Sequence, residues 1–110
     1  MQRVVVATVT QRECDEYAFL FEKLLAYRSL KIILDTKENI RRLVQLPSNI
    51  MDGIASEEKE VNKRINDWWN RMDEKYILEY DDRRVLALDF NECNIYSIDK
   101  REWYEENPGV

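Results

Sequence analysis

The chain has 110 residues, enough for one domain that buries roughly two-thirds of its unfolded surface without a disulfide or a metal. Hydrophobic residues make up 45% and charged residues 35% of the sequence, a balance that is typical of a globular protein and argues against intrinsic disorder. The formal net charge of −5 opposes the general electrostatic attraction to phosphates on which most nucleic-acid-binding proteins depend.

Several residue types are missing or scarce. The sequence contains no histidine, so it lacks the usual general base near neutral pH and the commonest zinc ligand, and carboxylates remain as the groups for catalysis. Cys14 and Cys93 form no metal-type cluster, and without an export signal we expect both to be reduced. The apolar runs are too short to cross a bilayer, so we expect a cytoplasmic protein with no membrane partner.

The first third of the chain has the pattern of a βαβ unit. Residues 2–9 are β-branched and short, which favours a buried strand. Thr10 and Glu13 have the spacing of a capping box, which predicts a helix from there to about Arg28. Residues 30–34 predict a second strand, and two strands joined by a helix are expected to be parallel with a right-handed crossover.

Asp35 follows this second predicted strand. It stands three residues before Glu38, so its spacing favours helix capping over catalysis. The helix that it would cap carries apolar residues at helical spacing and is expected to end at Pro47.

A further helix is predicted from Ser56, as its cap, to about residue 72. Its apolar stripe consists of Val61, Ile65, Trp68 and Met72. Because Trp68 and Trp69 are adjacent, both cannot face one core, and partial burial of one of them is expected.

The last third leaves one choice open. Residues 76–80 predict a third strand, and residues 95–98 predict a final strand that ends at Asp99, a cap for a helix over residues 100–106. Between them, residues 81–84 are either a hairpin turn before an antiparallel strand or the first turn of a helix. The spacing of residues 85–90 does not decide between the two.

Three aspartates would follow strands of this predicted sheet. Asp35, Asp82 and Asp99 are expected at strand–helix junctions along one edge, where open α/β sheets place their sites. Carboxylates gathered there suit Mg²⁺ or Mn²⁺, which can activate water for phosphodiester cleavage. Aspartate is also among the commonest helix caps and turn residues, and on the residues alone that structural interpretation is favoured.

The order of these features resembles the PIN-domain family of metal-dependent ribonucleases. The resemblance lies in the opening valine strand with Ala7 and Thr8, in residues 30–35, in the segment 82–88, and in residues 95–100. It implies a single domain over residues 1–110, with an α/β fold of three layers (α/β/α) and a central, mainly parallel sheet of about four strands. It also favours the helical choice after Asp82. An α+β fold is the alternative if residues 84–90 form a hairpin strand.

The resemblance also implies a site. Asp82, Asp99 and Asp35 would be the catalytic residues, and Asp82 and Asp99 would bind Mg²⁺ or Mn²⁺ with help from Asp81. Family members carry further acids at the positions of Ala7 and Leu43, so the implied metal is weakly bound or absent.

Two functions from different classes follow. The first is a PIN-like ribonuclease of toxin–antitoxin type, weak or inactive, with RNA as its substrate and an antitoxin as its protein partner. The second is a catalytically degenerate PIN-like binding or regulatory protein that acts through a protein partner. A third, an acidic inhibitor that mimics nucleic-acid charge, has only the net charge in its favour.

Overall fold

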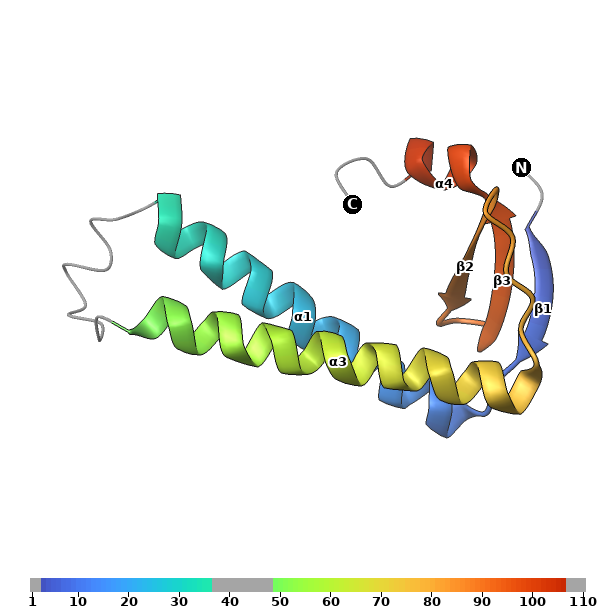
Figure 1. Cartoon of the computed structure of the whole chain (residues 1–110), viewed down its shortest axis with the longest axis horizontal. Helices are drawn as coiled ribbons and strands as arrows, with labels where there is room; N and C mark the ends of the chain where they lie inside the picture. The colour runs from blue at the N-terminus through green and yellow to red at the C-terminus, as the bar shows by residue number, and fades with distance from the viewer. Residues whose placement is uncertain (1–2, 37–48, 107–110) are drawn as a thin grey trace. The chain divides into compact units, whose positions relative to one another are not determined.

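The computed structural model describes residues 3–36 and 49–106 (Figure 1). The described elements are, in order, β1 (Val4–Thr8), α1 (Gln11–Thr36), α3 (Ile50–Tyr76), β2 (Arg84–Asp89), β3 (Asn94–Asp99) and α4 (Lys100–Glu106). The chain forms two compact units. One contains the described residues up to Glu16 and from Asn70 onward, and the other is Tyr17–Trp69.

The first unit contains a small antiparallel sheet. β3 lies between β1 and β2, as Figure 1 shows, and pairs antiparallel with both. In the β2–β3 register, Val85 faces Ile98 and Ala87 faces Tyr96. These four side chains share one face of the sheet, where Trp103 of α4 packs against the buried residues Ala87, Tyr96 and Ile98.

The predicted three-layer fold with a central parallel sheet is wrong. The described part of the chain has one sheet of three strands, and every pairing in it is antiparallel. The resemblance favoured a helix after Asp82, whereas residues 84–89 are strand β2. Asp89 Oδ1 accepts hydrogen bonds from the backbone N–H groups of Asn91 and Glu92, which fixes the tight turn that pairs β2 with β3.

The strand predicted at residues 30–34 is helical, because α1 continues to Thr36. Residues 29–36 contain no glycine or proline, so the helix that starts at the capping box continues through them. Within Tyr17–Trp69, Leu20 and Leu24 of α1 pack with Val61 of α3. The βαβ unit is therefore absent, and this removes the parallel strand pair on which the predicted fold depended.

Helix α3 begins at Ile50, before the predicted cap Ser56, which lies inside the helix. Its apolar stripe is confirmed, since Val61, Trp68 and Met72 are buried and Ile65 is partly buried. Trp68 is fully buried at 0% exposure, while the half-buried Trp69 contacts it edge-on at a ring centroid distance of 5.0 Å. The expectation that the two tryptophans differ in burial is confirmed.

The strand predicted at residues 76–80 is also wrong. Tyr76 is the last residue of α3, and Ile77 adopts a left-handed conformation with φ of 54°. The N–H of Ile77 donates to the carbonyl oxygen of Asp73 at 2.9 Å, a helix-ending arrangement. The helix predicted before Pro47 lies outside the described residues.

The first predicted strand is confirmed as β1, but its predicted burial is wrong. It is an edge strand, paired with β3 and antiparallel to it, and Val4, Val5 and Val6 are all exposed. Its register with β3 is irregular between Val5 and Ala7. Among the described residues, no helix has the length and apolar character that crossing a membrane requires.

Candidate functional site

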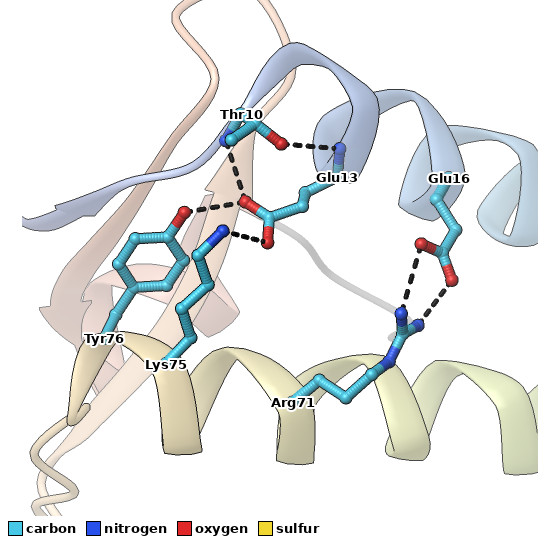
Figure 2. Close-up of polar contacts among 6 residues, drawn as sticks. All are labelled: Thr10, Glu13, Glu16, Arg71, Lys75 and Tyr76. Carbon is cyan, nitrogen blue, oxygen red and sulfur yellow. Dashed lines mark hydrogen bonds and ion pairs between the residues drawn. The ribbon is translucent and has the colours of Figure 1, made fainter.

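The capping box at the start of α1 is formed as predicted (Figure 2). The backbone N–H of Thr10 donates to Glu13 Oε1 at 2.9 Å, and the N–H of Glu13 donates to Thr10 Oγ1 at 3.1 Å. Each residue thus satisfies a backbone donor that the first turn of a helix leaves without an intrahelical partner.

Glu13 has two further partners, both from the end of α3 and in the same unit (Figure 2). The hydroxyl of Tyr76 donates to Oε1 at 2.6 Å, and Lys75 Nζ donates to Oε2 at 3.0 Å. Burial raises the pKa of Glu13, but the hydrogen bonds from Tyr76, Thr10 and Lys75 outweigh it and lower the pKa from 4.5 to about 2.

A carboxylate with so low a pKa is a poor general base near neutral pH, because it holds a proton only weakly. Glu13 has a structural role instead. Its hydrogen bonds to Thr10, Lys75 and Tyr76 join the start of α1 to the end of α3. A second ion pair between these helices, from Arg71 to Glu16, lies one turn further along (Figure 2). Sequence reasoning found the capping box but not its partners on α3, because no sequence pattern links residues that are so far apart in the chain.

The predicted site residues at the end of the β2–β3 hairpin bind backbone groups. Asp81 Oδ1 accepts from the N–H of Arg83 at 2.8 Å, and Asp99 Oδ1 accepts from the N–H of Arg101 at 2.9 Å. Asp81 thus fixes the turn before β2, and Asp99 caps α4. Asp82 is an exposed residue of the same turn.

The structure does bring these two segments together. Asp99 is the register partner of Arg84, and the N–H of Lys100 donates to the carbonyl oxygen of Arg83 at 2.8 Å. The side chain of Arg84 binds within the sheet, because its Nε donates to Ser97 Oγ of β3 at 2.6 Å. Asp81 and Asp99 share this end of the hairpin with four basic residues, Arg83, Arg84, Lys100 and Arg101.

Asp35 lies in the last turn of α1, within Tyr17–Trp69, and does not follow a strand as predicted. Within residues 3–36 and 49–106, no cluster of three or more acidic, cysteine or histidine side chains could hold a metal ion. The Mg²⁺ or Mn²⁺ implied by the resemblance stays a prediction.

Strand β1 presents a different kind of surface. Val4, Val5 and Val6 are exposed by 51%, 56% and 40%, and the strand contains no charged residue. Arg3, which precedes it, lies over the ring of Tyr96 at 4.4 Å and within 3.9 Å of Asp89 Oδ2. Edge strands are usually protected by charges or proline, and β1 has only the irregularity after Val5.

Sequence reasoning missed this surface although the signal was present. Three consecutive β-branched residues place apolar side chains on both faces of a strand, a pattern that fits a central parallel strand and an uncovered edge strand equally well. No family model matches the chain, and no curated protein or solved structure is significantly similar to it.

Proposed function

We propose that this chain is a binding protein that acts through a protein partner, and that the partner adds an extended segment along β1. The supporting observation is that β1 is an edge strand whose three valines are exposed. In the described part of the chain, β1 pairs with β3 alone, so its other side offers backbone N–H and C=O groups to another strand.

The chemistry of β1 limits the partner. Backbone hydrogen bonds would provide affinity without sequence preference, and apolar side chains beside Val4, Val5 and Val6 would provide specificity. The net charge of −5 favours a partner whose segment carries basic residues next to its apolar ones. The exposed apolar side chains of α1, such as Phe19 and Leu25, offer area but no unpaired backbone.

Site-specific photo-cross-linking tests the proposal. A photoreactive phenylalanine analogue replaces Val5 in the full chain, expressed in the cells from which the protein comes, and a matched probe replaces Tyr104 of α4. Val5 and Tyr104 lie in the same unit and are exposed by 56% and 52%, so the two probes are about equally accessible to a passing protein. We expect one protein to be linked through position 5 and not through position 104.

The linked protein is then purified and its affinity measured. We expect Val5→Asp to weaken binding at least about tenfold, because a charge on the strand disfavours apolar side chains beside it, while Tyr104→Asp leaves binding unchanged. The backbone amides of β1 should exchange with solvent more slowly in the complex. Equal linking at both positions, or a complex insensitive to Val5→Asp, would refute strand addition at β1.

The ribonuclease implied by the resemblance stays a prediction with its own assay. Mn²⁺-dependent cleavage of RNA that is lost in the double variant Asp82→Asn, Asp99→Asn would support it. If the chain is a binding protein, we expect no cleavage by the wild type or by the double variant, because Asp81 and Asp99 accept backbone hydrogen bonds in a turn and a helix cap. Asparagine can make the same hydrogen bonds, so the double variant should fold.

A further inference from the structure

The two cysteines, distant in sequence, lie together in the first unit. Cys14 is in the first turns of α1 and is only 2% exposed, whereas Cys93 is half-buried in the turn between β2 and β3. The thiol of Cys14 donates to the carbonyl oxygen of Phe90 at 3.6 Å, and the thiol of Cys93 lies 3.9 Å from the same oxygen. The Cys93 thiol also donates to Gln11 Oε1 at 3.4 Å. Both sulfur atoms therefore lie near the carbonyl oxygen of Phe90.

The backbone around the pair is tied by hydrogen bonds. The N–H of Val9 donates to the carbonyl oxygen of Cys93 at 2.9 Å, and the N–H of Cys14 donates to the carbonyl oxygen of Thr10 at 3.0 Å. Cys93 itself adopts a left-handed conformation with φ of 52°. The short segment from Val9 to Cys14 and the hairpin turn are thus fixed next to each other, which keeps the two thiols close.

The two thiols differ in accessibility. Burial raises the pKa of Cys14 to about 12, and the hydrogen bond and like charge of Cys93 add to this effect. Because Cys14 is buried and Cys93 is only half-buried, a reagent in solution reacts first with Cys93. The thiol of Cys14 can react only with a group that is already next to it in the protein.

We propose that Cys14 and Cys93 are a redox-active dithiol that forms an intramolecular disulfide by exchange with a small disulfide such as oxidised glutathione. The pair is independent of the proposed binding surface. It is a modification site that joins the start of α1 to the β2–β3 turn.

The exchange takes two steps. The Cys93 thiolate attacks one sulfur of oxidised glutathione, whose S–S bond breaks, and the departing thiolate takes up the proton that Cys93 has lost. Cys14 then loses its proton and attacks the Cys93 sulfur, which releases the second glutathione as its thiolate, and that thiolate takes up the proton. Two protein thiols are oxidised, and one glutathione disulfide is reduced to two thiols.

The test uses the full chain, reduced and then equilibrated in buffers of different ratios of reduced to oxidised glutathione. Intact mass measures the loss of two hydrogens or the gain of glutathione, and non-reducing electrophoresis separates bonds within a chain from bonds between chains. We expect the wild type to lose two hydrogens without retaining glutathione. The oxidised form should unfold about 5–10 °C higher, because the bond closes a long loop in the unfolded chain.

Two variants check the order of events. Cys14→Ala keeps a small apolar residue in the core and should accumulate one glutathione on Cys93, because no second thiol releases it. Cys93→Ser should gain almost none, because Cys14 is buried. Circular dichroism confirms that both variants are folded.

Three results would overturn the proposal. The first is a wild type that keeps two alkylatable thiols at every ratio. The second is a wild type that retains glutathione as Cys14→Ala does. The third is a disulfide that forms only between chains.

Discussion

At the scale of single residues, four carboxylates of the first unit accept hydrogen bonds from the backbone. Glu13 and Asp99 accept N–H groups at the starts of α1 and α4, and Asp81 and Asp89 accept N–H groups in turns. Such bonds satisfy donors that helix starts and turns leave without partners, and each contributes about 1 kcal/mol. The abundance of acids in the sequence thus has a structural cause at these four positions.

Replacing Glu13 tests the largest of these clusters. Glu13→Gln should lower the free energy of unfolding by about 1–3 kcal/mol, because an amide makes weaker bonds to Lys75 and Tyr76 than the carboxylate does. Glu16→Gln is the matched control, since its ion pair with Arg71 is exposed and should change stability by less than about 1 kcal/mol. Urea denaturation measures both. Equal losses in the two variants would show that the Glu13 cluster adds no stability beyond an ordinary surface pair.

The pH dependence follows from the lowered pKa of Glu13. A group whose pKa is about 2 when folded and 4.5 when unfolded stabilises the protein above about pH 4.5, and this stabilisation is lost as the pH falls toward 2. Glu13→Gln removes it at every pH, so the stability difference between wild type and variant should shrink between pH 4.5 and 2. Thermal melts at several pH values measure this difference. A difference that stays constant down to pH 2 would contradict the lowered pKa.

Asp99 allows capping to be separated from metal binding. A cap needs an acceptor oxygen, so Asp99→Asn should keep nearly full stability and Asp99→Ala should lose about 1 kcal/mol. A metal ligand needs charge, so under the metal hypothesis both variants would lose Mn²⁺ affinity equally. Thermal unfolding with and without Mn²⁺ measures the two effects. A wild type stabilised by Mn²⁺, with that stabilisation lost in Asp99→Asn, would establish the ligand role.

At the scale of elements, the sequence signals that proved correct have a local physical cause. The box of Thr10 and Glu13 and the cap at Asp99 involve residues close in sequence, and the α3 stripe shows helical periodicity over many residues. The errors fall on short apolar runs at residues 30–34 and 76–80, where strand and helix have the same composition and only tertiary packing decides. The site residues stay a prediction, but the argument that gathered them at one sheet edge required parallel strands, and the described sheet is antiparallel.

The helical assignment of residues 30–34 has a direct mutational test. In α1, Leu34 is buried and Ile32 is 63% exposed. Residues two apart lie on opposite sides of a helix but on the same face of a strand. Leu34→Ala should therefore cost at least about 2 kcal/mol, and Ile32→Ala less than about 1 kcal/mol. Urea denaturation with circular dichroism measures both. Equal costs would favour the strand that the sequence alone predicts.

At the scale of the whole molecule, each unit contains an apolar cluster formed by its own residues. Leu20, Leu24 and Val61 form one cluster in Tyr17–Trp69, and Ala87, Tyr96 and Ile98 form the other in the sheet unit. The sequence predicted one domain over residues 1–110, and nothing in composition or periodicity marks a division, because α1 and α3 each contribute residues to both units without a break in the helix.

Because each unit has an apolar cluster of its own, we expect each unit to unfold locally without the other. Amide hydrogen exchange measures such local unfolding residue by residue. Leu24→Ala removes buried side-chain contacts with Val61, so the amides of α3 around Val61 should exchange at least about tenfold faster. The amides of Tyr96 and Ile98 should keep their wild-type rates, because their protection comes from the sheet. Ile98→Val is the reciprocal control: it should accelerate exchange in β2 and β3 and leave the amides near Val61 unchanged. If either variant instead accelerates all protected amides by one common factor, the chain opens as a single cooperative domain, as the sequence predicted.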